Sequence, residues 1–327
     1  MIRTRLDAPI VLAHGLFGFR RIGLGRLTLT SYFRGIPEQL RASGNQVVVT
    51  RVPAIAGVKH RARMLGEEIE AAFPGQAVHI IGHSMGGLDA RQLLADPKWA
   101  GRILSLTTIG TPHHGSAIAD FARLKVGKAY RLLHLLGIEH RGFLDLTRRA
   151  ARAVGRSGFK PEGVACFCVA GDPAIQDICW PLKPFFDILC DLEGPNDGLV
   201  SVASAHGFGT SLPTWPVDHF RQMSWLPPDS GHSSVHAILG FYETLLANLL
   251  AHGFPGEMMD SSTIHPSIIR SNDRQGLSRL GAFWQIRGAR RSVEQNGHGH
   301  IAEHVGSRPA TIEKPVDGKE NGDLVGG

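Results

Sequence analysis

Hydrophobic and polar positions follow two alternating patterns over the first third of the chain. Apolar runs rich in β-branched residues occur at residues 9–15, 45–53, 77–84 and 102–112. Between them, residues 60–73 and 86–96 place apolar side chains at helical spacing. Runs that are apolar throughout are typical of strands buried on both faces of a sheet. The alternation therefore predicts an α/β fold with a mostly parallel central sheet and helices on both faces.

The pattern changes after residue 116. Residues 116–160 are helical in pattern and basic, with ten Lys/Arg against three Asp/Glu, and they interrupt the series of strands as an insertion. A further strand is predicted at residues 164–172, then a loop-rich region with several prolines, and a long amphipathic helix at 233–253. Residues 255–327 are polar and without periodicity, which predicts a disordered tail. We therefore expect one domain over residues 1–254 with a helical lid or cap at 116–160.

Length and charge exclude several classes of protein. The chain has 327 residues, 43% of them hydrophobic and 20% charged, as expected for a globular protein with a sizeable core. The net charge of +6 is spread along the chain, and no cluster of basic and aromatic residues predicts nucleic-acid binding. No apolar run has the length of a signal-peptide core or a membrane span, so a cytoplasmic protein is expected. The oligomeric state is not predicted.

Metal and cofactor chemistry receives no support from the sequence. The four cysteines are Cys166, Cys168, Cys179 and Cys190, and their spacing fits no zinc template. Cys166 and Cys168 alternate along a predicted strand and are expected to face one side as small hydrophobic residues. A disulfide between Cys179 and Cys190 is left open. The tail histidines (His298, His300 and His304) are interpreted as part of the polar tail, and no metal or cofactor is expected.

A lone serine stands between two glycines at the end of one apolar run. The segment from Gly82 to Gly86 matches the pattern G-x-S-x-G, with Ser84 at its centre, between a predicted strand and a predicted helix. A nucleophilic serine in this pattern lies on a sharp, strained turn, and the glycines leave room for that turn. The helix that begins beyond the serine favours negative charge nearby. The context predicts that Ser84 is a nucleophile rather than part of a glycine-rich structural turn.

An alkyl hydroxyl needs a base and an orienting acid to attack at neutral pH. In hydrolases with this pattern the acid and then the histidine follow the serine along the chain. The candidate acids are Asp197, in a turn-forming cluster, and Asp172, at the end of a predicted strand. The candidate bases are His219, His232 and His236; His206 lies too close to Asp197 in sequence for easy geometry. Position alone leaves these alternatives open.

Acyl transfer also needs backbone donors for the oxyanion of the tetrahedral intermediate. One is expected to be the N–H of Met85, directly after the serine. The second is expected in the loop after an early strand, and the segment AHGLFGF supplies such a loop, with His14 and Gly15 ahead of Leu16. His14, Gly15 and Phe17 of this loop are the predicted substrate contacts.

Five segments of the chain resemble, in order, those of the bacterial triacylglycerol lipases, a group of α/β-hydrolases. They are PIVLAHGLFGF, GHSMGG, IGTPHHGS, FLDLT and NDGLVS, and the resemblance extends from residue 9 to residue 225. It implies the α/β-hydrolase fold, with Ser84 as nucleophile, Asp197 as acid and His219 as base. It also implies that Leu16 and Met85 supply the oxyanion donors.

The resemblance further concerns a lid and a metal site. Residues 116–160 occupy the place of the family's lid, and basic amphipathic helices suit an apolar acyl substrate at an anionic lipid interface, although a helical cap that only covers the site has the same pattern. Many members bind a structural calcium through an aspartate two residues after the catalytic histidine. Here that residue is Arg221, which cannot ligate calcium. Our hypothesis is an ion pair between Arg221 and an upstream carboxylate such as Asp177.

The sequence thus predicts a serine carboxylester hydrolase. We expect a lipase or esterase that acts on acylglycerols or other apolar acyl esters through an acyl-enzyme intermediate. Two alternatives remain at this point: an acyltransferase that uses the same triad, and a non-catalytic hydrolase-like protein that binds a ligand. The complete set of Ser84, Asp197 and His219 favours the enzyme. Acyl length and head group are not predicted.

Overall fold

The structure is a computed structural model that describes residues 1–16, 22–24, 27–30, 32–125, 141–155, 162–224 and 235–259. These residues belong to one compact unit, residues 1–269. Several sequence predictions fall outside the described residues: Phe17, His232, residues 126–140 and 156–160 of the expected lid, and residues 260–327 of the expected tail.

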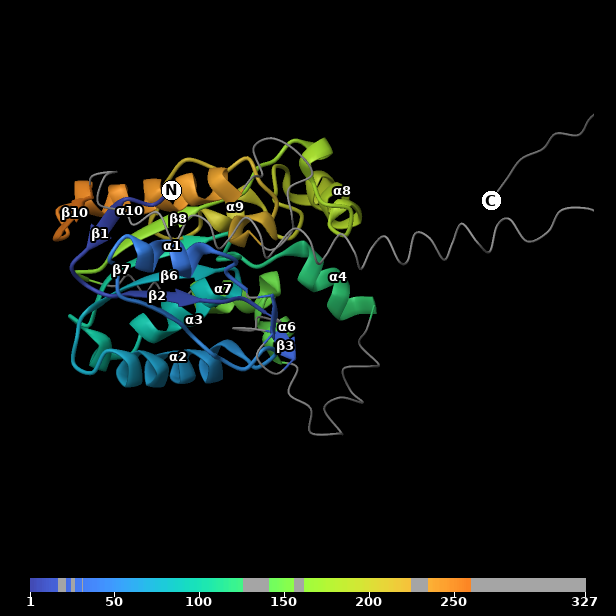
Figure 1. The fold of residues 1–327 in the computed structure, drawn as a ribbon. Helices are drawn as coiled ribbons and strands as arrows, with labels where there is room; N and C mark the ends of the chain where they lie inside the picture. The colour runs from blue at the N-terminus through green and yellow to red at the C-terminus, as the bar shows by residue number, and fades with distance from the viewer. Residues whose placement is uncertain are drawn as a thin grey trace, which may run out of the picture. The chain divides into compact units, whose positions relative to one another are not determined.

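A six-stranded sheet forms the centre of this unit (Figure 1). Its order is β5-β2-β6-β7-β8-β9, and every neighbouring pair is parallel. The strands are β2 (Ile10–Ala13), β5 (Val47–Val49), β6 (Val78–His83), β7 (Ile103–Ile109), β8 (Ala165–Val169) and β9 (Thr210–Ser211). The predicted parallel sheet is confirmed, and β6 is buried along its whole length, as its continuous apolar run indicated.

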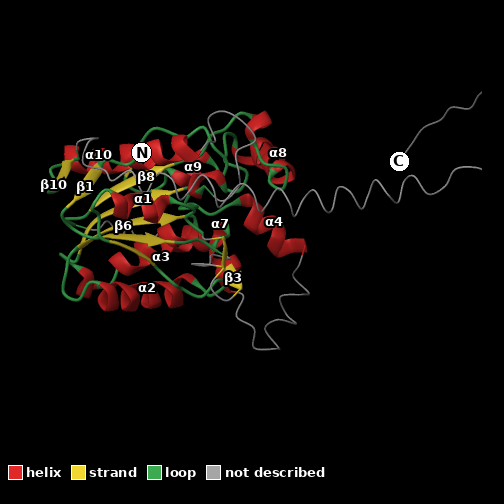
Figure 2. Ribbon diagram, viewed as in Figure 1, coloured by secondary structure: helices red, strands yellow, loops and turns green. Residues whose placement is uncertain are grey.

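Helices cover both faces of this sheet (Figure 2). The helices α2 (Val58–Ala72) and α3 (Met85–Leu94) lie on one face, and α1 (Ile36–Ala42) and α10 (Val235–Ala251) lie on the other. Strand β2 shows the division: Ile10 and Leu12 pack in the core cluster of α1 and α10, whereas Val11 and Ala13 pack in that of α2 and α3. Alternate residues of a buried strand thus serve two apolar layers.

The described parts of residues 116–160 are three helices, α4 (Ala117–Lys125), α6 (Arg141–Asp145) and α7 (Arg148–Gly155). The remaining short elements are η1 (Pro97–Trp99), η2 (Ile175–Asp177), α9 (Val202–Ala205) and η3 (Arg221–Met223). Two further strand pairs lie outside the central sheet: β1 (Thr4–Leu6) with β10 (Gly256–Met258), and β3 (Ile22–Leu24) with β4 (Leu27–Thr30). No helix among the described residues is long and apolar enough to cross a membrane.

Two elements differ from the sequence prediction. Where the prolines indicated a loop, the chain forms α8 (Lys183–Glu193), because Pro184 stands in the first turn, where a helix tolerates proline. Strand β10 pairs with β1 beyond residue 254, where we expected the tail to begin. The pairing joins segments about 250 residues apart in sequence, and a local pattern carries no signal for such contacts.

All four cysteines are free thiols. Cys166 and Cys168 pack against the same core cluster, so the prediction that they share one face of a strand is confirmed. Cys179 is buried and Cys190 is exposed on α8, and the two are not joined. The disulfide left open by the sequence is therefore absent from this structure.

Burial of His79 in β6 makes the stability of the fold depend on pH. Its side chain is 1% exposed, Nδ1 lies 2.8 Å from Ser105 Oγ, and burial lowers the pKa to about 4 from 6.5. Between pH 6.5 and about 4, this histidine is therefore protonated in the unfolded chain but neutral in the native state. The free energy of unfolding thus decreases as pH falls through this window.

His79→Gln removes this titration and is expected to flatten the acid loss of stability. The slope of unfolding free energy against pH should decrease by up to about 1.4 kcal/mol per pH unit in that window. Urea unfolding at a series of pH values measures the slope. Measurements above pH 7.5, where the unfolded histidine is neutral as well, serve as the internal control. Parallel curves for the two proteins from pH 7.5 to pH 4 would contradict the prediction.

Candidate active site

The carboxyl ends of the central strands meet at one edge of the sheet. In the register, Ala13 of β2 lies beside Gly82 of β6, and His83 lies beside Ile109 of β7. Because parallel strands end together, the residues that follow them converge at this edge, where α/β folds commonly bind ligands. The site is built from the segments that follow β2, β6, β7, β8 and β9.

Ser84 occupies a strained turn between β6 and α3. Its backbone has φ 55° and ψ −128°, a conformation that side-chain-bearing residues rarely adopt. The backbone N–H of Ser84 donates to Ile109 O at 2.9 Å, which fixes the turn to the neighbouring strand. A Cβ at Gly86 would lie 2.3 Å from Ala13 O, so only glycine fits there. The side chain of Ser84 thus projects from a tightly constrained turn, and the residue is 9% exposed.

Asp197 and His219 are in direct contact. Asp197 Oδ2 lies 2.8 Å from His219 Nδ1, and the backbone N–H of His219 donates to Asp197 O at 2.9 Å. Asp197 Oδ1 accepts the backbone N–H groups of Leu199 at 3.0 Å and Val200 at 2.8 Å. Since a carboxylate only accepts, His219 carries its proton on Nδ1, and Nε2 is left to accept a proton.

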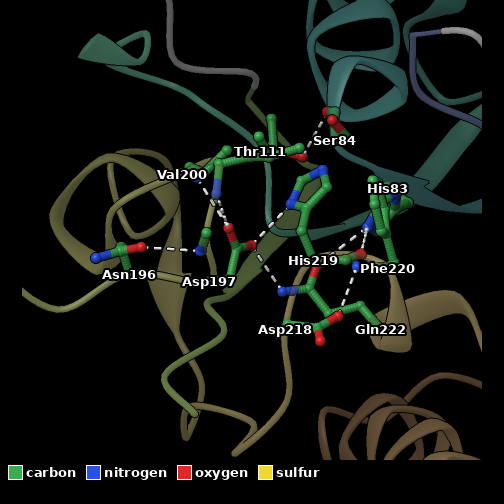
Figure 3. A network of polar contacts seen from close by, with 12 residues as sticks. His83, Ser84, Thr111, Asn196, Asp197, Val200, Asp218, His219, Phe220 and Gln222 are labelled. Atoms are coloured by element: carbon green, nitrogen blue, oxygen red, sulfur yellow. Dashed lines mark hydrogen bonds and ion pairs between the residues drawn. The ribbon is translucent and has the colours of Figure 1, made fainter. Parts of the chain in front are cut away.

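The imidazole of His219 lies between Asp197 and the serine turn. In Figure 3 the edge of the His219 ring opposite Asp197 points toward Ser84. The ring of His83, the residue before Ser84, lies 4.6 Å from the His219 ring, centroid to centroid. Among the rivals, Asp172 and His236 are exposed, and His206 is half-buried. The structure therefore brings Ser84, Asp197 and His219 to the same edge of the sheet.

The loop after β2 passes directly beside Ser84. A Cβ at Gly15 would lie 2.8 Å from Ser84 Cβ and 3.2 Å from its Oγ, so a larger residue would press on the serine. Met85 is the first residue of α3, and its N–H has no acceptor within the helix. Met85 thus follows Ser84 directly, and Gly15, the residue before the predicted donor Leu16, packs beside it. His14 is 1% exposed, contacts Gly15 O through Nδ1 at 3.0 Å, and has its pKa lowered to about 4 by burial.

A buried ion pair, which the sequence analysis missed, holds this loop. Arg61 of α2 is fully buried, and its Nε lies 2.8 Å from Asp89 Oδ2 of α3. Its Nη2 donates to His14 O at 2.6 Å and to Gly15 O at 3.2 Å. Burial raises the pKa of Asp89 to about 7, although the positive charge of Arg61 acts to lower it. One signal was available: Arg61 falls on the same helical stripe as Leu65, where a charged residue is unexpected.

Arg221 contacts Asp177, the residue named in our hypothesis, but at its backbone carbonyl and not at its carboxylate. Its Nη1 lies 2.7 Å from Asp218 Oδ2 and donates to the backbone carbonyl of Asp177. The carboxylate partner is therefore Asp218 rather than Asp177. Asp218 Oδ2 also accepts the backbone N–H of Cys179 at 3.0 Å. Arg221 and Asp218 thus join the loop that carries His219 to the segment around η2. Among the described residues, no group of three or more His, Cys, Asp or Glu could hold a metal ion.

Sequence and fold are both similar to those of known proteins. Residues 54–131 match the family model described as a PGAP1-like alpha/beta domain. A triacylglycerol lipase of Vibrio cholerae serotype O1 is 30% identical over 265 residues, covering 68% of this chain and 81% of that protein. Triacylglycerol lipase 2 of Saccharomyces cerevisiae is 39% identical over 210 residues, covering 59% of this chain and 62% of the yeast protein. The structure of Staphylococcus hyicus lipase aligns with a TM-score of 0.60 at 19% identity, covering 75% of this chain and 95% of that one.

Proposed function

The chain belongs to the triacylglycerol lipases of the α/β-hydrolase superfamily and is a carboxylester hydrolase, and we propose that it cleaves apolar acyl esters through an acyl-enzyme intermediate on Ser84. The observation that carries this proposal is the contact of 2.8 Å between Asp197 Oδ2 and His219 Nδ1, beside a serine on a strained turn. Neither acyl transfer nor ligand binding without catalysis is favoured by the relatives.

In the proposed reaction His219 is the general base. Its Nε2 takes the proton of Ser84 Oγ as the oxygen attacks the ester carbonyl, and later gives that proton to the leaving alcohol. Asp197 holds the Nδ1–H tautomer and stabilises the imidazolium that forms. Water then repeats the sequence on the acyl-enzyme and releases the acid.

The oxyanion is proposed to bind between the backbone N–H groups of Leu16 and Met85. The carbonyl of Gly15 and the N–H of Leu16 belong to one peptide group and point in opposite directions. Arg61 Nη2 lies 3.2 Å from Gly15 O on the buried side, which supports a Leu16 N–H that faces the site. Donors fixed in advance in this way are worth two to three orders of magnitude, roughly, in acyl transfer.

A lid at residues 116–160 and contact with a lipid surface are part of the same proposal. On α4, Phe121 is 41% exposed and Leu124 is 75% exposed, and α4 packs against α8, where Leu192 is 59% exposed. Exposed apolar side chains on neighbouring helices favour contact with an apolar surface. We expect acylglycerol or another apolar acyl ester as substrate.

A panel of p-nitrophenyl esters of increasing acyl length, together with an emulsified long-chain ester, tests this function. The expected result is turnover of the esters and covalent labelling of Ser84 by a fluorophosphonate probe, located by peptide mapping. Preference for the emulsion indicates a lipase, and preference for short soluble esters indicates an esterase. Absence of both turnover and labelling would leave a ligand-binding protein as the explanation.

Arg61→Met tests the support of the oxyanion loop. The variant leaves Asp89 buried without its partner, so the free energy of unfolding should fall by about 3–5 kcal/mol. The deficit should be larger at pH 8 than at pH 6, because Asp89 must stay protonated to remain buried. We also expect kcat to fall by about 10-fold, since Gly15 O loses a donor that orients the Leu16 peptide.

Arg63→Met is the matched control for this experiment. Arg63 lies on the same helix, its side chain is 58% exposed, and it pairs with Glu67 four residues on. Its replacement should change stability by less than about 1 kcal/mol and leave kcat unchanged. Adding Asp89→Leu to Arg61→Met should restore stability but not kcat. Full recovery of kcat in that double variant would show that Arg61 serves stability alone.

A further inference from the structure

Three buried polar side chains lie between the oxyanion loop and Asp197. The backbone N–H of Gly15 donates to Tyr32 Oη at 2.9 Å, and Tyr32 Oη lies 2.7 Å from His83 Nδ1. His83 Nε2 lies 3.0 Å from Gln222 Oε1, and Gln222 Nε2 donates to Asp197 Oδ2 at 2.8 Å. Figure 3 shows the half of this row that runs from His83 to Asp197. The row connects two ends of the site that are far apart along the chain.

The direction of every hydrogen bond in this row is determined. Asp197 is acceptor-only, so Gln222 must present its amide nitrogen to Asp197 and its carbonyl to His83. His83 Nε2 also lies 3.1 Å from the backbone carbonyl of His219, so Nε2 faces two acceptors and carries the proton. Burial lowers the pKa of His83 well below its usual value, so the ring is neutral. Nδ1 therefore carries no proton and acts as a hydrogen-bond acceptor.

The direction continues to the oxyanion loop. Tyr32 has one hydroxyl proton, and His83 Nδ1 is the acceptor that receives it. The hydroxyl oxygen then accepts the N–H of Gly15. This N–H is committed to Tyr32 and is not available to an oxyanion. The next N–H along the loop, that of Leu16, is the one left to face the substrate.

The surroundings of Gln222 favour a role for its amide rather than simple filling of space. A Cβ at Gly110 would lie 2.3 Å from Gln222 Oε1, and a Cβ at Gly171 would lie 2.4 Å from Gln222 Nε2. The segments that follow β7 and β8 therefore keep both sides of the amide clear. Buried polar groups lower stability unless they are hydrogen-bonded, and each polar side-chain atom of this row has at least one partner.

We propose that Tyr32, His83 and Gln222 are positioning residues that form a one-directional hydrogen-bond relay, which aligns the oxyanion loop with the Asp197–His219 pair. The proposal rests on the proposed function of Ser84, His219 and Asp197. The relay fixes the Gly15 peptide at one end and supplies the fourth hydrogen bond to the Asp197 carboxylate at the other. Displacement of either end disturbs the other through His83.

Gln222→Glu, Gln222→Met and Tyr32→Phe test the relay. The groups that face the Asp197–His219 pair are His83 and Gln222, while the neighbouring Asp218 is paired with Arg221. In Gln222→Glu the introduced carboxyl lies against the Asp197 carboxylate in a buried site, so it holds a proton, which it donates to Asp197 Oδ2, while its carbonyl oxygen accepts from His83 Nε2. At pH 7 this variant should therefore retain more kcat than Gln222→Met, and its kcat/KM should fall as pH rises and the shared proton is lost.

The two variants that remove a hydrogen-bonding group, Tyr32→Phe and Gln222→Met, test whether the two ends of the relay are coupled. Tyr32→Phe and Gln222→Met should each lower kcat by about 10-fold with KM within about two-fold, because the lost alignment matters in the transition state. The double variant should lose about as much as either single variant rather than the product of both. Tyr242→Phe is the matched control: its hydroxyl donates to the backbone carbonyl of Gln222 at 3.2 Å, outside the relay. It should lower the melting temperature and leave the pH profile unchanged.

The outcomes separate the relay from the function on which it rests. A higher kcat in Gln222→Glu than in Gln222→Met, with a decline of kcat/KM at high pH, and losses that do not multiply support the relay. Equal losses in these two variants, or losses that multiply, overturn the relay while the function stands. Turnover retained by Ser84→Ala overturns both. Melting temperatures of all variants show that each measured protein is folded.

Discussion

Ser84→Ala is expected to lower kcat by about five orders of magnitude or more while the protein folds normally, since loss of the nucleophile in a serine hydrolase removes the action of the whole triad. The residual rate comes from substrate binding and the oxyanion donors alone. Among the described residues, the hydrogen bonds of Ser84 are made by its backbone: its N–H donates to Ile109 O, and its carbonyl accepts from Thr111 Oγ1 and from the N–H of Gly87. Removal of the hydroxyl therefore leaves the turn intact.

A second exchange at the same position separates chemistry from strain. Ser84→Gly should lose the same activity, but its melting temperature should equal or exceed that of Ser84→Ala. Glycine adopts a φ of 55° freely, whereas alanine retains the strain of roughly 1–3 kcal/mol. Single-turnover kinetics with a p-nitrophenyl ester and thermal unfolding measure the two effects. Retention of more than about 1% of the wild-type kcat in both variants would place the nucleophile elsewhere.

The parts of the molecule that a short sequence segment determines could be predicted. The strand, the serine turn and the helix that follow one another from β6 to α3 carry their signals within a single segment: an apolar run, two glycines and a helical period. The alternation of strands and helices likewise gave the parallel sheet, because each strand is buried on both faces. In both cases the residues that make the signal also make the structure.

The parts that depend on contacts between distant segments could not be predicted. Tyr32 and Gln222 are ordinary residues in sequence, and only the fold brings both to His83. Asp89 supports the oxyanion loop through Arg61, which contacts a carbonyl 46 positions earlier in the chain. No periodicity reports such a contact.

The ion-pair partner of Arg221 was also not predictable from the sequence alone. A basic residue near a loop predicts an ion pair, but several carboxylates lie within reach of a long side chain. Asp218 stands three residues before Arg221, and the turn that leads into η3 brings their side chains together, so Asp218 pairs with the guanidinium. The upstream segment then offers its backbone carbonyl at Asp177 instead of its carboxylate.

Asp197→Asn is expected to lower kcat by about 10⁴-fold with little change in KM. The Asp197 carboxylate accepts the Nδ1–H of His219 and the amide of Gln222 on one oxygen. An asparagine that keeps its carbonyl on the backbone N–H groups of Leu199 and Val200 presents an amide nitrogen to two donors. His219 then relieves the conflict by moving its proton to Nε2, and in that tautomer it cannot accept the proton of a serine.

Asp172→Asn is the matched control for Asp197→Asn, because it makes the same chemical exchange in the rival acid. Asp172 is exposed, and the hydrogen bond to Trp215 O is made by its backbone N–H. Replacement of the side chain therefore leaves this hydrogen bond in place. We expect kcat/KM within about two-fold of wild type and an unchanged melting temperature, since exposed substitutions change stability by about 0.5 kcal/mol or less. Nitrogen NMR of the His219 ring in Asp197→Asn should show the proton on Nε2. An inactive Asp172→Asn beside an active Asp197→Asn would assign the acid to the end of β8 and require a different partner for His219.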